Sequence, residues 1–296
     1  MAHLSLSRAW EDTRAIFARD GALIASVALA LLVLPETIVG LINPPGAGSA
    51  NLIARIVWLA GGLVTLIGQI AIVRLALGPS TTVGQAISHG ARRFLPMLGA
   101  LLVLFLILAV IVIPLMMLLM AGHIIAVPVE GQQPPPSFTL FALVLAVISL
   151  ALSVKFTMSV PVAAAEHCGP VEILKRSWRL TGGNYWRLLA FVLLLLLTTV
   201  ILLFVAQFVG GIVAQLIGGG RVQPLSVGAL LMALFQAAAT ATATTLFAVM
   251  LALLYLQLVN GREVQASVPS SGTGGAQSFG RKPRSRGSGK RSIARL

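Results

Sequence analysis

Residues 188–217 read LLAFVLLLLLTTVILLFVAQFVGGIVAQLI and contain no charged side chain. Crossing about 30 Å of hydrocarbon takes roughly 20 apolar residues in a helix, so this stretch is long enough to span a bilayer. The whole 296-residue chain follows the same pattern, with 57% hydrophobic and 10% charged residues. Soluble domains carry roughly 25% charged residues, so a water-soluble enzyme is excluded. The composition predicts an all-α polytopic membrane protein.

Six stretches of the chain meet the length requirement for a transmembrane helix. They cover residues 21–41, 52–77, 95–121, 138–160, 188–217 and 225–259. Their spacing groups them into three consecutive helical hairpins. We therefore expect a six-span membrane domain over residues 1–260. Residues 261–296 are rich in Gly, Ser, Pro and Arg and predict a disordered basic tail, because such a segment cannot bury enough apolar surface to fold.

The distribution of Lys and Arg predicts the orientation. With the N-terminus inside, 18 of the 21 Lys and Arg residues fall on the cytoplasmic side. Arg55 and Arg221 then face outward, and Lys155 lies within a span. Basic residues near span ends favour the cytoplasm. The sequence therefore predicts an inner-membrane protein with both termini in the cytoplasm.

Each odd-numbered span is preceded by a polar segment that keeps apolar residues at helical spacing, which predicts an amphipathic helix in the interface. Such helices would pin each hairpin to anionic headgroups through their basic residues. The recurrence suggests an internal threefold repeat. The three predicted stripes are Leu6, Trp10, Thr13 and Phe17; then Val83, Ile87, Gly90 and Phe94; then Val171, Leu174, Trp178, Thr181 and Tyr185.

The segment that precedes the fifth span, residues 161–187, reads PVAAAEHCGPVEILKRSWRLTGGNYWR. It resembles the bacterial glycerophosphoryl diester phosphodiesterase membrane-domain family. The resemblance implies a membrane module without catalysis, because in relatives with phosphodiesterase activity a separate soluble barrel supplies it. The matching positions are Pro161, Glu166, Gly169, Arg176, Ser177, Trp178, Leu180, Gly183, Trp186 and Arg187.

Cations and aromatic rings recur in the second and third amphipathic segments, a combination suited to phospholipid headgroups. Two alternatives remain open, nonspecific anchoring, which is favoured, and a defined phospholipid-binding site. The candidate headgroup contacts are Arg92, Arg93, Lys175, Arg176, Trp178, Arg179, Tyr185, Trp186 and Arg187.

Two ionisable residues lie in or at the end of the fourth span. Lys155 either binds an anion inside the bundle or, as favoured, extends to the cytoplasmic interface while its methylenes stay buried. Glu166 is expected to brace the following helix by pairing with an Arg between residues 175 and 187. Near the outer surface, Glu36 is expected to pair with Arg55.

The sixth span carries two interleaved patterns. Ala233, Ala237, Ala241 and Thr245 form a small-residue series typical of close helix packing. Gln236, Thr240 and Thr244 could instead line a hydrated path, but packing is the favoured interpretation.

Sequence motifs for catalysis are missing. The chain has a single cysteine, Cys168, and four scattered histidines, and it contains no HExxH, GxSxG, GxGxxG or GxxxxGK[ST] pattern. We therefore expect no catalytic residues, no cofactor and no metal site.

These observations favour a noncatalytic protein that binds or organises phospholipid. The alternative is a transporter or flippase for a small anionic or lipid-linked solute. The expected partners are the bilayer and its anionic headgroups, which also attract the basic tail more readily than nucleic acid would. For protein partners, a homo-oligomer and another membrane protein both remain open.

Overall fold

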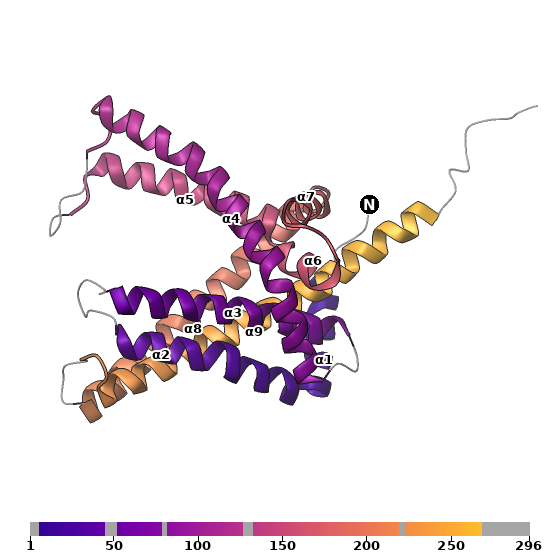
Figure 1. The fold of residues 1–296 in the computed structure, drawn as a ribbon, viewed down its shortest axis with the longest axis horizontal. Helices are drawn as coiled ribbons and strands as arrows, with labels where there is room; N and C mark the ends of the chain where they lie inside the picture. The colour runs from indigo at the N-terminus through magenta and orange to yellow at the C-terminus, as the bar shows by residue number, and fades with distance from the viewer. Residues whose placement is uncertain (1–5, 45–51, 79–81, 127–132, 219–222, 268–296) are drawn as a thin grey trace, which may run out of the picture.

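A computed structural model describes residues 6–44, 52–78, 82–126, 133–218 and 223–267 (Figure 1). Over these residues the chain is helical and has no strand, and six of its helical segments are long and apolar enough to cross a membrane. The all-α polytopic prediction is therefore confirmed. The elements are α1 (Leu6–Ala28), the π-helical turn η1 (Leu29–Val33), α2 (Leu34–Ile42), α3 (Leu52–Leu77), α4 (Val83–Ala121), α5 (Pro136–Phe156), α6 (Ser159–Ala165), α7 (Pro170–Thr181), α8 (Tyr185–Gly218) and α9 (Val227–Ser267).

The chain passes back and forth between two ends of the bundle. In Figure 1 the ends of α2, α4 and α8 lie at the left, together with the starts of α3, α5 and α9. The start of α1, helix α7 and the end of α9 lie at the right. This is the threading expected for three hairpins. We call the left end the outer end and the right end the inner end.

Helix α9 forms the centre of the packing. In its most apolar window 56% of the residues are buried, more than in any other described span. Ala233, Ala237, Ala241 and Thr245 are all at most 6% exposed, so the predicted packing face is confirmed. Small side chains let the backbones approach, because a Cβ added to Gly40 would lie 2.9 Å from the Cβ of Ala233.

Two prolines interrupt the spans. Pro35 follows η1, where the amide of Leu34 donates to the carbonyl of Leu29 instead of the usual fourth residue back. Pro161 lies in the first turn of α6, and its ring opposes the carbonyl of Thr157, where α5 breaks from α6. The fourth span was expected to end at residue 160. Instead the helix resumes after the break and continues to Ala165.

The second hairpin lies at the periphery. In Figure 1 the outer halves of α4 and α5 lean away from α2, α3, α8 and α9. The apolar window of α4 is 0% buried within the structure and that of α5 only 6%. Apolar side chains that face neither protein nor water must contact hydrocarbon, so this hairpin is covered mainly by lipid.

The predicted boundaries need two further corrections. The first two amphipathic segments are continuous with their spans in α1 and α4, and only the third forms a separate helix, α7. Gly182 and Gly183 interrupt the helix at that one place, whereas the single glycines Gly21 and Gly99 do not break α1 or α4. Helix α9 also extends to Ser267, so residues 261–267 are helical rather than part of the tail. The remainder of the predicted tail lies outside the described residues.

The packing of α9 makes a testable prediction. Replacing the fully buried Ala237 with Leu inserts three carbons into a close helix contact and should destabilise the protein by about 1–3 kcal/mol. Ala238→Leu is the matched control, because Ala238 is exposed and should tolerate the change within about 0.5 kcal/mol. Thermal unfolding of both variants in detergent provides the measurement, and equal midpoints would contradict the central position of α9.

Candidate lipid-headgroup site

The helix break at Pro161 positions α7. The carbonyl of Lys155 accepts a hydrogen bond from Ser177 Oγ at 2.9 Å and a longer one from Thr181 Oγ1 at 3.2 Å. The single hydroxyl hydrogen of Thr181 is shared with the carbonyl of Ser177, which lies 2.9 Å away. Both hydroxyl-bearing residues are buried, at 0% exposure. A carbonyl without a donor is costly away from water, so these two bonds stabilise the broken end of α5 and hold α7 against it.

This docking corrects the predicted stripe of α7. The buried face consists of Ile173, Leu174, Ser177, Leu180 and Thr181. Val171 and Trp178, which were expected on that face, are 50% and 47% exposed. The amphipathic face was misplaced because Ser177 counted as polar in the sequence pattern, whereas its hydroxyl is satisfied inside the protein.

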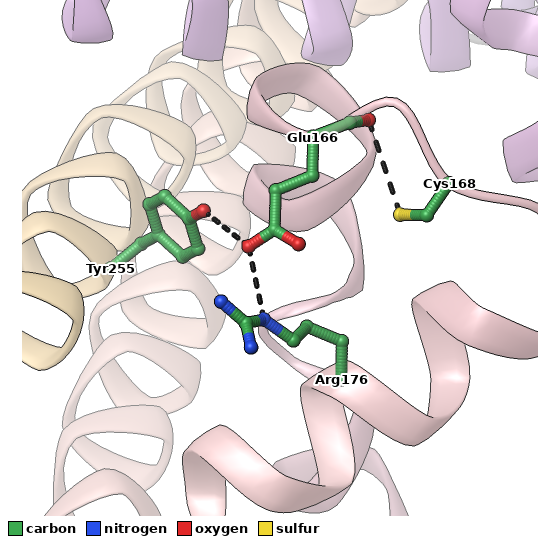
Figure 2. Close-up of polar contacts among 4 residues, drawn as sticks. All are labelled: Glu166, Cys168, Arg176 and Tyr255. Atoms are coloured by element: carbon green, nitrogen blue, oxygen red, sulfur yellow. Dashed lines mark hydrogen bonds and ion pairs between the residues drawn. The ribbon is translucent and has the colours of Figure 1, made fainter. Parts of the chain in front are cut away.

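Glu166 connects three elements at the inner end (Figure 2). Its Oε1 accepts a hydrogen bond from Tyr255 Oη of α9 at 2.8 Å and an ion-paired one from Arg176 Nε of α7 at 3.1 Å. The predicted pairing with a nearby Arg is confirmed. Tyr255 was missed, because it lies 89 residues further along the chain in an apolar span. The sequence offered one signal for Tyr255, which is that the chain contains only two tyrosines.

Lys155 contacts the other tyrosine. Its Nζ lies 4.9 Å from the centroid of the Trp178 ring and 5.1 Å from that of Tyr185. Both distances are within the range of cation–π attraction. Lys155 thus reaches the elbow between α7 and α8. That this elbow lies at the cytoplasmic interface remains a prediction.

A groove of about 800 Å³ opens beside this elbow. One part of its lining is apolar, and the other carries charged side chains from the exposed surface of α7. Acyl carbons suit the first part and an anionic headgroup suits the ammonium and guanidinium groups of the second. The lining residues are Ile107, Phe156, Val171, Glu172, Leu174, Lys175, Trp178 and Arg179.

The groove brings together only some of the residues predicted from the sequence. Lys175, Trp178 and Arg179 line it, whereas Arg176 contributes its Nε to the Glu166 contact. The others lie outside the groove: Arg92 and Arg93 on the first turns of α4, exposed and half-buried, Tyr185 half-buried beside Lys155, and Trp186 and Arg187 exposed on the first turn of α8. Ile107 of α4 and Phe156 of α5 were missed, since nothing distinguishes them from other apolar residues in their spans.

Cys168, the single cysteine, lies between α6 and α7. Burial raises the pKa of its thiol, and the nearby carboxyl groups of Glu166 and Glu172 raise it further. Its Sγ lies 4.0 Å from the carbonyl oxygen of Glu166 (Figure 2). The raised pKa favours an inert thiol, because the thiolate is the reactive form.

Metal ligands do not cluster in the part of the chain that the structure describes. No group of three His, Cys, Asp or Glu side chains within it is placed to hold a metal ion. The expected lack of a metal or cofactor remains a prediction.

The fold and this elbow define a multi-pass α-helical membrane protein with a cationic, aromatic groove at one end. The model of a family described as "Domain of unknown function (DUF7847)" matches residues 4–258, so the chain belongs to that family. No curated protein and no solved structure matches the chain.

The Glu166 contacts predict thermodynamic coupling. Tyr255→Phe should lower the free energy of unfolding by about 2 kcal/mol, because it removes a hydrogen bond to a carboxylate. Arg176→Ala should also destabilise, and the double variant should be non-additive by about 0.5 kcal/mol or more, since both residues bind Oε1 of Glu166. Lys175→Ala is the control that should add independently to Tyr255→Phe. Strict additivity of Arg176→Ala with Tyr255→Phe would refute the shared contact.

The pKa of Cys168 predicts slow alkylation. At neutral pH the folded protein should react with a maleimide more slowly than free cysteine does, because less of its thiol is ionised. The rate should keep rising with pH after that of free cysteine has levelled off, and detergent denaturation should abolish the difference. A folded-state profile that coincides with free cysteine would rule out the raised pKa. Cys168→Ser provides the blank.

Proposed function

We propose that this protein is a noncatalytic membrane protein that binds anionic phospholipid at its inner end. The groove between α7, α4 and α5 is the observation that carries the proposal, because it places Lys175 and Arg179 beside the apolar Ile107 and Phe156. A phospholipid carries the complementary groups in the same order, an anionic phosphate followed by apolar acyl chains. The groove favours a defined site over nonspecific anchoring alone.

The charges that line the groove are sufficient to favour anionic over zwitterionic lipids. Each Lys or Arg near an anionic surface contributes about 1 kcal/mol, so the two cations together favour an anionic over a zwitterionic headgroup by about 2 kcal/mol. Trp178, 47% exposed at the groove, offers an aromatic ring of the kind that partitions to the headgroup zone. Glu172 on the same lining disfavours a second negative charge, which selects for headgroups with a single phosphate charge.

The orientation and location form part of the proposal. The excess of Lys and Arg at the inner end supports a cytoplasmic placement for that end, and therefore for both termini. The resemblance of residues 161–187 to the glycerophosphoryl diester phosphodiesterase membrane-domain family supports a bacterial inner-membrane module. The basic tail then lies next to the anionic leaflet and adds to its attraction.

A transporter or flippase is the second candidate. The observation that favours it is the presence of two interrupted spans, at η1 and at the break between α5 and α6. Interrupted helices expose backbone groups and recur at the substrate sites of transporters. At the α5 break, however, Ser177 and Thr181 already occupy the Lys155 carbonyl. Lipid binding therefore remains the better supported function.

Native mass spectrometry of the purified protein with mixed lipids tests the proposal. The wild type should retain phosphatidylglycerol in preference to phosphatidylcholine, and Lys175→Gln combined with Arg179→Gln should reduce this preference about tenfold or more. Arg14→Gln, which removes an exposed cation from α1, is the matched control for Arg179→Gln and should leave the preference unchanged. Equal retention of both lipids by the wild type would refute the assigned site.

A flux assay in reconstituted vesicles separates the two candidate functions. Transport of a fluorescent lipid or small anion that disappears in Lys155→Ala would favour the transporter. Selective lipid retention without flux supports the binding protein.

A further inference from the structure

A second polar site lies at the outer end of the bundle, opposite the end that carries the groove. It is a cavity of about 120 Å³ between α2, α8 and α9. Half of its lining residues are polar, although the three helices around it are apolar. The lining residues are Glu36, Val39, Gly40, Asn43, Gln207, Met232, Ala233 and Gln236.

The cavity lies within the hydrophobic part of the spans. Glu36 precedes the end of α2 at Ile42 by six residues, a rise of about 9 Å, and Gln236 follows the start of α9 at Val227 by nine, about 14 Å. Polar and ionisable groups at such depth are costly and usually serve a function. The ion pair expected between Glu36 and Arg55 is not formed among the described residues.

The carboxamide of Gln236 has an unused acceptor. Its Oε1 is buried and has no hydrogen-bond partner among the described residues. Leaving a buried acceptor without a donor costs about 1–3 kcal/mol. Gln236 lines the same cavity as Glu36, so the cavity combines a carboxyl group with a carboxamide side chain.

A π-helical turn in the first span brings Glu36 and Asn43 to the face of the helix that meets α9. The π-helical turn η1 inserts one extra residue before Pro35, which rotates the following helix by about 100° relative to α1. The face that carries Glu36, Gly40 and Asn43 then meets α9, where Gly40 packs against Ala233. Asn43 and Gln207 are exposed and form the rim, whereas Glu36 and Gln236 are half-buried and lie deeper.

The chemistry of the lining defines the ligand. A carboxyl group and three carboxamides supply oxygen acceptors, and no Lys, Arg or His is among the lining residues. The carboxyl group is the single charged group of this lining, so a cation with N–H donors complements it best. The volume admits a small group and excludes a bulky one. A primary ammonium satisfies these conditions, since its three N–H donors can reach the carboxyl group and two amide oxygens.

We propose that the outer cavity binds a small primary ammonium group, supplied either by a free amine or by the amine headgroup of a lipid. Glu36 provides the counter-charge, and the carboxamide of Gln236 lies beside it in the lining. Asn43 and Gln207 surround the entrance. This site is independent of the groove at the inner end, so either proposal can fail without the other.

Thermal unfolding of the full-length protein in phosphatidylcholine nanodiscs tests the proposal, with ethanolamine as the free amine. A ligand bound only by the folded state raises Tm by mass action, here by about 2 °C or more at roughly ten times the Kd. The rise should be lost in Glu36→Gln and in Gln236→Leu, and kept in Glu11→Gln, which removes an exposed carboxyl group of α1 at the inner end. Choline, whose nitrogen has no N–H donor, should give no rise.

The lipid source is tested by replacing half of the phosphatidylcholine with phosphatidylethanolamine. A Tm increase that requires Glu36 and Gln236 assigns the site to the headgroup, and one produced by free ethanolamine assigns it to a soluble amine. Either result supports the proposal. No increase from either source, or an equal increase in Glu36→Gln, overturns it. Should Glu36→Gln fail to fold, Gln236→Leu carries the same comparison.

Discussion

The arrangement of the inner end depends on a break in the fourth span, where a proline removes a backbone hydrogen-bond donor. Pro161 has no amide hydrogen to donate to the carbonyl of Thr157, so the fourth span breaks between Phe156 and Ser159. In a bilayer such a break is tolerated only where other groups satisfy the exposed backbone. Ser177 and Thr181 do so for one carbonyl at the break, that of Lys155, which lies two residues before Thr157. The position of α7, and with it the groove, follows from that requirement.

The contacts of Glu166 also hold α7 in place, because they join the end of α6 to α7 and α9. Glu166 ends α6 and binds Arg176 of α7 and Tyr255 of α9, so the elbow is fixed to the most buried helix of the bundle. With the polar face of Ser177 and Thr181 turned inward, Lys175, Trp178 and Arg179 remain on the outer surface of α7. Pro161, Glu166, Arg176 and Ser177 in the motif of residues 161–187 thus each have a structural reason, which is the placement of α7.

The two polar sites lie at opposite ends of the bundle and have opposite character. The groove at the inner end carries Lys175 and Arg179, whereas the cavity at the outer end carries Glu36 and carboxamides. Helix α9 contributes to both ends, through Tyr255 at the inner end and Gln236 at the outer end. Its small-residue face between them is closely packed and buried, which accounts for the favoured interpretation of packing over a hydrated path.

The sequence alone determined the number of spans, their order and the packing face of α9, because hydrophobic length and small-residue spacing are properties of each helix by itself. It also determined the pairing of Glu166 with an Arg, since both residues lie within one short segment. Only the tertiary structure decided which face of α7 is buried, that Tyr255 reaches Glu166, that Ile107 lines the groove and that Glu36 and Gln236 line one cavity. These outcomes depend on two proline-induced interruptions and on contacts between residues far apart in the chain, and neither leaves a periodic signal within a single helix.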